Sequence, residues 1–250
     1  TNTTQSRLGE FWGEFSKEKS GIVGLILLAL CVLVVIFEPL ILPWKEVNSN
    51  WRDINYWQDN PASAPPEWTN FFSKTKAPVT QRLTKANREE VDLDGGAKMV
   101  TYTLDYKYEA DKAPLDVIFH ISGTGDIPIV VSIERPDGIK VELFQRFEQG
   151  LADQDIRISA DNDGRNAAFA FVKHYESEEA LEAYSSSSLR TTDLLFNTAQ
   201  QGMARQFIPL KGTYKLIAQA MIIDPANMDI KDPYVVVTGS VSGLLGTDDS

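Results

Sequence analysis

Two histidines are the side chains best suited to acid–base chemistry near neutral pH, and the chain has no others. His120 lies in the alternating stretch 117–121, and His174 follows the alternating pair Phe169 and Phe171. Such stretches predict strands, in which a lone histidine is usually a half-buried sheet residue. Neither histidine has an obvious carboxylate or cysteine partner in the sequence. We therefore predict no catalytic residue and expect that the protein is not an enzyme.

A short acidic segment resembles the start of a calcium loop, in which alternate positions supply oxygen ligands: Ser159, Asp161, Asp163 and Gly164. The twelfth position of that loop needs a bidentate carboxylate, and here it is Ala170. The sequence also lacks the nucleotide phosphate loop, the H-E-x-x-H zinc motif and the G-x-S-x-G serine elbow. We therefore expect no bound metal and no cofactor.

An apolar stretch near the start of the chain predicts a transmembrane helix over residues 21–44. No charged side chain lies between Ser20 and Phe37, and as a helix the stretch would reach roughly 34 Å, which matches a bilayer core. A cleaved signal would have a shorter apolar region that ends in small residues, whereas this one ends at Glu38-Pro39-Leu40-Ile41-Leu42-Pro43-Trp44. We expect Glu38 to lie near the outer end of the span, where water and headgroups reach it.

The charges that flank the span predict its orientation. Arg7, Lys17 and Lys19 precede it, and cytoplasmic flanks carry an excess of lysine and arginine. We therefore expect a cell-membrane protein whose N-terminus is cytoplasmic and whose residues after about Trp44 are extracytoplasmic. The only cysteine, Cys31, falls inside the span, so the outer part has no disulfide.

Residues 1–20 are predicted to include a cytoplasmic amphipathic elbow helix. Leu8, Phe11, Trp12 and Phe15 recur at helical spacing with charged residues opposite, which is typical of a helix that lies in the membrane interface. The alternative is a frayed tail, because the segment is short and contains two glycines.

Residues 45–98 are predicted to form an ordered juxtamembrane connector that is rich in aromatic residues and proline. Trp51, Trp57 and Trp68 favour the membrane–water boundary, as Trp44 does at the end of the span. A sugar-binding platform of stacked rings is the alternative reading. The membrane-interface residues that we predict in the whole chain are Phe11, Trp12, Phe15, Trp44, Trp51 and Trp57.

Residues 99–243 alternate apolar and polar side chains and predict an antiparallel β-sandwich, so the fold class is mainly β. Seven strands are expected, around residues 99–108, 117–121, 129–133, 141–143, 169–171, 214–218 and 234–238. Asp137-Gly138 predicts a hairpin turn, and Gly123-Thr124-Gly125-Asp126 predicts a second turn. Residues 177–202 lose the alternation and predict a short helical insertion, with a helix capped by Ser177 and a second helical piece through Leu194, Leu195 and Phe196.

The balance of charge argues against nucleic acid as a partner. The 250 residues carry a net charge of −11, and phosphate backbones require basic patches. About 205 residues follow the span, which is enough for one domain with its own core.

Both ends of the chain resemble C-type permease subunits of dipeptide and oligopeptide ABC importers. Members begin with an aromatic-rich elbow, here Phe11-Trp12-Gly13-Glu14-Phe15, and end their first span with an apolar run like Glu38–Trp44. Residues 244–250 contain Gly246, Thr247 and Asp248, which resemble the start of the G-T-D-x-x-G-R-D signature that precedes the second membrane helix. The long insert between these landmarks resembles an archaeal and thermophile-type branch, and the chain would be its N-terminal fragment.

The resemblance implies several partners. These are a second permease subunit, two ATP-binding subunits, an extracytoplasmic substrate-binding protein and the lipid bilayer. It implies peptides as cargo, although related systems carry oligosaccharides or nickel, and it implies that the outer domain covers the pore mouth or docks the binding protein. The alternative is a single-pass surface protein whose β-sandwich binds a ligand or another cell component, and a membrane-anchored hydrolase is a weaker one.

Overall fold

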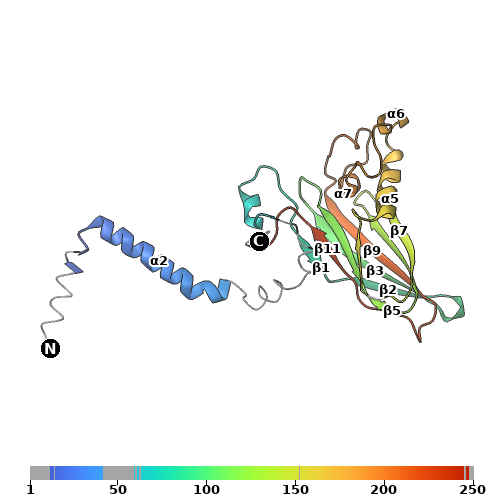
Figure 1. The fold of residues 1–250 in the computed structure, drawn as a ribbon, viewed down its shortest axis with the longest axis horizontal. Coiled ribbons are helices and arrows are strands. Elements are labelled where there is room, and N and C mark those ends of the chain that lie inside the picture. The colour runs from blue at the N-terminus through green and yellow to red at the C-terminus, as the bar shows by residue number, and fades with distance from the viewer. Residues whose placement is uncertain are drawn as a thin grey trace. The chain divides into compact units, whose positions relative to one another are not determined.

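The computed structural model describes residues 12–13, 15–41, 59, 61, 63–151, 153–244 and 246–247, and the side chains of the first helix as far as Glu38. The chain divides into two compact units, residues 1–57 and residues 58–250, and each is described by itself. The units are an apolar helix and a body of antiparallel sheets with a few short helices (Figure 1).

Helix α2 covers Lys19–Ile41 and is long and apolar enough, from Lys19 to Glu38, to cross a membrane. It is the one such helix in the described part of the chain. Its side chains from Ile22 to Phe37 are exposed. A helix with apolar side chains around its whole circumference needs an apolar surrounding, so the prediction of a membrane-spanning helix here agrees with the structure.

The larger sheet of the second unit has five strands in the order β2-β3-β9-β6-β7, and every neighbouring pair is antiparallel. The strands are β2 (Asn87–Asp92), β3 (Lys98–Tyr108), β9 (Gly212–Ile222), β6 (Ile127–Glu134) and β7 (Lys140–Glu148). The turn at Asp137-Gly138 joins β6 to β7 as predicted, and Gly138 has the positive φ that such a turn requires.

The second sheet has four strands in the order β1-β11-β4-β8, again antiparallel throughout. They are β1 (Gln81–Leu83), β11 (Tyr234–Thr238), β4 (Asp116–Ile121) and β8 (Gln154–Arg157). A two-stranded sheet pairs β10 (Asp229–Ile230) with β5 (Gly123–Thr124). Gly123 and Thr124 are therefore strand residues and not part of a turn, whereas Gly125 turns the chain with φ of 88°.

The core lies between the two main sheets. Alternate residues of β3 are buried, as the period of two predicts, and they are Val100, Tyr102, Leu104, Tyr106 and Tyr108. All six residues of β4, which lies between β11 and β8, are buried, so both faces of this strand are covered. The prediction of a mainly β, antiparallel sandwich is confirmed.

One predicted strand is wrong. Phe169 and Phe171 lie in helix α5 (Asn162–Lys173), and His174 follows at its C-cap and not in a strand. The buried residues Gly164, Ala168, Phe171 and Val172 recur every three or four positions, so the segment packs against the sheet with helical periodicity. The spacing of two phenylalanines was too short a pattern to separate a helix from a strand.

The insertion after α5 contains the two short helices that the sequence predicts. Helix α6 (Glu178–Leu181) begins after Ser177, whose hydroxyl accepts from the amide of Ala180, and helix α7 covers Thr191–Leu195. Helix α5 packs against β7 and α7. In Figure 1 the three helices gather at one end of the sheets.

Residues 59–98, within the stretch expected to be a connector, fold with the second unit. They contain the 3₁₀ helices η1 (Glu67–Phe71) and η2 (Asp94–Gly96) as well as β1 and β2. All six residues of β2 are exposed, so this edge strand has no apolar alternation that could reveal it in the sequence. The segment Asn87–Asp92 is a strand because it pairs with β3.

Candidate functional site

The two ends of the described β-rich unit are joined to each other by hydrogen bonds. We call this junction the neck and define it as Asp59, Pro61 and residues 63–67 with residues 238–244, 246 and 247. The amide of Glu67 donates to the carbonyl of Gly243 at 2.9 Å, and the Glu67 carboxylate accepts from the Gly243 amide at 3.1 Å. In Figure 1 the C-terminal segment accordingly runs beside the short helix η1. The chain therefore enters and leaves this unit at one place.

Thr247 closes the neck at its far end. Its hydroxyl accepts from the amide of Ala64 at 2.8 Å and donates to the carbonyl of Pro61, while its own amide donates to the carbonyl of Ala64 at 2.8 Å. The preceding Gly246 has φ of 79°, and a side chain there would meet the carbonyl oxygen of Ala64. Two residues of the predicted family motif thus lie in the neck, and Asp248 lies outside the described residues.

A cluster of charges attaches the neck to the four-stranded sheet. His120 on β4 has Nδ1 at 2.5 Å from Asp155 on β8 and Nε2 at 2.9 Å from Asp59 in the neck. The Nε2 contact lacks hydrogen-bond geometry and is an ion pair only when the imidazole is protonated. Arg157 approaches Asp59 at 3.3 Å. Burial raises the pKa of Asp59, and the charges of His120 and Arg157 oppose that rise.

The ring of His120 also lies on an aromatic stack. Its plane is 12° from that of Tyr234, at a centroid distance of 4.2 Å, and the guanidinium of Arg82 lies 3.9 Å from the Tyr234 ring. The sequence correctly placed His120 in a strand but missed both of its carboxylate partners. Asp155 is 35 residues away in sequence, and no local pattern announces such a pair. Through these two carboxylates His120 links β8 to Asp59 in the neck.

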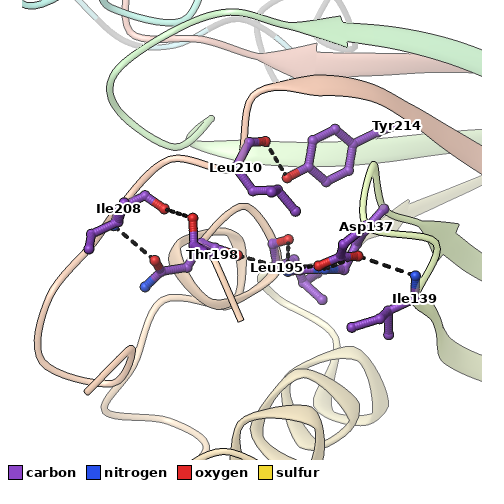
Figure 2. Close-up of polar contacts among 9 residues, drawn as sticks. Asp137, Ile139, Leu195, Thr198, Ile208, Leu210 and Tyr214 are labelled. Carbon is purple, nitrogen blue, oxygen red and sulfur yellow. Dashed lines mark hydrogen bonds and ion pairs between the residues drawn. The ribbon is translucent and has the colours of Figure 1, made fainter. Parts of the chain in front are cut away.

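A second buried cluster centres on Arg135, whose side chain is fully buried. Its guanidinium donates to the carbonyl oxygens of Leu195 at 2.6 Å and Asn197 at 2.8 Å, and pairs with Asp137 at 2.8 Å. Figure 2 shows the neighbouring contacts of this loop, in which Thr198 bonds to Ile208 and the Tyr214 hydroxyl donates to Leu210. Arg135 therefore fastens the helical insertion to the hairpin of β6 and β7.

Asp137 is the counter-charge of that arginine. Burial alone would raise the pKa of Asp137, but the hydrogen bonds and charge of Arg135 outweigh it and hold the pKa below its usual range. The aspartate that the sequence assigned to a turn thus also neutralises a buried cation.

The segment that resembles a calcium loop is a helix start. The Asp161 carboxylate accepts from the amides of Asp163 and Gly164 as the N-cap of α5 and pairs with Arg146. Ser159 instead donates to Asp116 at 2.6 Å. In the part of the chain that the structure describes, no three His, Cys, Asp or Glu side chains are placed to hold a metal ion.

Of the predicted interface residues, Trp12 and Phe15 are described. Their rings stack at 6.0 Å, and the Phe15 ring packs against Gly21 at the start of α2. Phe11, Trp44, Trp51 and Trp57 lie outside the described residues.

The fold and the neck define a class of protein: an apolar helix that can cross a membrane, followed by a β-sandwich whose ends are joined. Residues 6–66 match the family model described as the N-terminal TM domain of oligopeptide transport permease C. The match supports an oligopeptide permease domain at the start of the chain and ends at Pro66, inside the neck. No curated protein matches the chain.

Solved structures resemble the chain only distantly. TmCBM61 in complex with β-1,4-galactotriose has 10% identity and a TM-score of 0.27, with 68% of this chain and 93% of that chain covered. A family 29 carbohydrate-binding module has 9% identity and a TM-score of 0.22, with 67% and 94% covered. At these TM-scores nothing is carried over to this chain.

Proposed function

We propose that this chain is the N-terminal part of a membrane-embedded permease subunit of an ABC importer for dipeptides or oligopeptides. The match of residues 6–66 to a permease domain supports this proposal, as does the apolar helix α2 within that match. In this function α2 is the first membrane span, the N-terminus is cytoplasmic, and the β-rich unit lies outside the cell as an insert of the archaeal and thermophile type.

The neck is the observation that carries the proposal. A domain inserted between two membrane spans must begin and end close together, and domain insertions are tolerated where the chain ends lie near each other. Thr247 bonds to Ala64 across 183 residues of sequence. The motif residues Gly246, Thr247 and Asp248 would then lead from the neck toward the next span.

The proposed partners follow from the division of labour in such importers. The chain has no nucleotide phosphate loop, so ATP is bound by two separate subunits, and a second permease subunit completes the pore. An extracytoplasmic binding protein delivers the peptide. The β-rich unit covers the pore mouth or docks that binding protein, and Phe11, Trp12, Phe15, Trp44, Trp51 and Trp57 lie at the membrane interface.

The test is purification of the tagged chain from gently solubilised membranes of the cells that make it, with mass spectrometry of what co-purifies. We expect an ATP-binding subunit that carries a phosphate loop and a second permease subunit. Recovery of the intact chain without any ATP-binding subunit would overturn the proposal. The coding sequence after Ser250 is a second test, because a permease requires further long apolar runs there.

A single-pass surface protein is the second candidate, and the closed core of the β-rich unit favours it. Among the described residues the core cluster is formed within that unit, from Val100 to Val237. A unit of this kind could bind a ligand without any pore. The same purification separates the two functions, since a surface protein needs no ATP-binding subunit.

A further inference from the structure

An exposed aromatic patch lies next to the neck. Trp68 and Phe71 belong to η1 and Phe72 follows it, and they are 55%, 87% and 77% exposed. We call these three residues the aromatic patch. No residue of η1 is buried, so the patch contributes nothing to the core between the sheets. A cluster of large, solvent-exposed apolar side chains indicates a surface that contacts another molecule or a membrane.

The patch is held in one shape. The Asn70 side chain donates to the carbonyl of Ala77 and accepts from its amide, both at 2.9 Å, and the Thr69 hydroxyl donates to Pro66 at 2.6 Å. Glu67, at the start of η1, is bonded to Gly243 across the neck. The rings therefore protrude from a fixed turn that is tied to both ends of the unit.

The rings do not form a flat platform. The planes of Trp68 and Phe72 meet at 87° and those of Phe71 and Phe72 at 83°. A platform on which a sugar stacks across several rings needs ring faces in one plane, and this edge-to-face cluster does not form one. Exposed aromatic side chains, tryptophan above all, suit a boundary between hydrocarbon and water.

The charges beside the patch favour lipid as its occupant. Lys74 and Lys76 lie two and four residues after Phe72 and are exposed, in a chain whose net charge is −11. The carboxylates of Asp111 and Glu109 lie near Lys76, and they pair with Lys211 and Lys107. Exposed lysines next to apolar side chains suit a lipid surface, because their stems contact apolar groups while their charged ends reach headgroup phosphates. Leu244, 64% exposed, follows the Gly243 that bonds to Glu67 and adds a further apolar side chain at this end.

We infer that the aromatic patch, with Lys74 and Lys76, is a membrane-seating surface by which the β-rich unit rests on the bilayer. Because Glu67 joins the patch to the neck, this contact fixes the tilt of the unit on the membrane. The inference rests on the proposed place of α2 in the bilayer and is independent of peptide transport.

The experiment places a nitroxide at single cysteines of the full chain in vesicles of neutral and anionic phospholipid. Oxygen, which concentrates in hydrocarbon, and a water-soluble nickel complex then report the surroundings of each label. Cys31 in α2 serves as it stands, and Cys31→Ser combined with Phe71→Cys or with Phe147→Cys supplies the other two labels. Phe147 is 56% exposed on β7, away from η1, and is the matched control.

We expect the labels at positions 31 and 71 to favour oxygen and the label at position 147 to favour the nickel complex. A further variant that adds Trp68→Ser and Phe72→Ser to the position 71 label should shift that label toward the nickel complex, with unchanged circular dichroism. If the label at position 31 favours oxygen while the label at position 71 favours the nickel complex, the inference about the aromatic patch is overturned. The proposal that α2 lies in the bilayer is then still supported.

If position 71 is shielded from both reagents, a protein covers the patch and the inference is likewise overturned. If position 31 itself favours nickel, α2 does not lie in lipid, and then the proposed function fails together with the inference.

Discussion

Thr247 and Ala64 form two hydrogen bonds of 2.8 Å each although 183 residues separate them: the Ala64 amide donates to the Thr247 hydroxyl, and the Thr247 amide donates to the Ala64 carbonyl. The two bonds hold Thr247 against the segment at the start of the β-rich unit. The described ends of this unit therefore meet at the neck.

Thr247→Val should loosen the neck. Valine keeps the shape of threonine but leaves the amide of Ala64 and the carbonyl of Pro61 without the hydroxyl partner, at a cost of about 1–3 kcal/mol. Urea unfolding of the chain in detergent, followed by circular dichroism, measures the loss. Thr213→Val, at an exposed position of β9, is the control and should change the free energy of unfolding little. Equal effects of the two changes would contradict the role of Thr247.

Gly246→Ala should destabilise the unit more than Gly138→Ala. Both glycines have positive φ, of 79° and 81°, which costs a residue with a side chain roughly 1–2 kcal/mol. A side chain at Gly138 meets open space, whereas one at Gly246 meets the backbone of Ala64 and Pro66. The difference between the two unfolding free energies isolates the close approach in the neck. Equal losses of unfolding free energy for the two variants would mean that the backbone of the neck shifts to make room for a side chain at position 246.

Arg135→Met should be among the most damaging single changes in the β-rich unit. It removes the donor to Leu195 and Asn197 and leaves Asp137 without its counter-charge, and breaking a buried pair costs about 3–5 kcal/mol. Arg205→Met, at an exposed position, is the control. Chemical unfolding measures the free energy of unfolding of both variants. If Arg135→Met lost less of this free energy than the rupture of an exposed ion pair costs, the role of Arg135 would be refuted.

The contribution of Asp137 should depend on pH. Its pKa is lower in the folded chain, so its stabilisation is complete above the unfolded value of about 3.9 and is lost as the pH falls through the lower folded value. The free energy of unfolding of the natural chain minus that of Asp137→Asn should therefore shrink on acidification.

The contribution of Asp116 to stability should change with pH in the opposite direction. Burial raises the pKa of Asp116 despite the hydrogen bonds from Ser159, so the same difference for Asp116→Asn should fall as the pH rises. If the difference in unfolding free energy changed with pH in the same direction for both variants, the opposite pKa shifts of Asp116 and Asp137 would be contradicted.

Asp161→Ala should lower stability through the helix cap and not through a metal. Loss of a carboxylate N-cap costs about 1 kcal/mol, and a chelator should leave the melting temperature unchanged. Asp163→Ala, which removes an exposed side chain of the first turn, should cost less. A melting temperature that falls with the chelator would restore the calcium reading.

Local patterns in the sequence were enough to predict three features of this protein. The uncharged run after Ser20 specifies a lipid-soluble helix, because every side chain around it is apolar. The alternation of Val100, Tyr102 and Leu104 specifies a strand with one buried face, and Ser177 specifies the start of a helix.

Features that depend on residues far apart in the chain became visible in the folded structure and were not predictable from the sequence. Phe169 and Phe171 became helical because the packed face recurs with a period near 3.6. His120 gained Asp155 through the pairing of β4 with β8. His120 gained Asp59, and Thr247 gained Ala64, where the neck brings distant segments together. Local periodicity reports which face of an element is buried, but it contains no information about which distant element supplies the partner of a polar group.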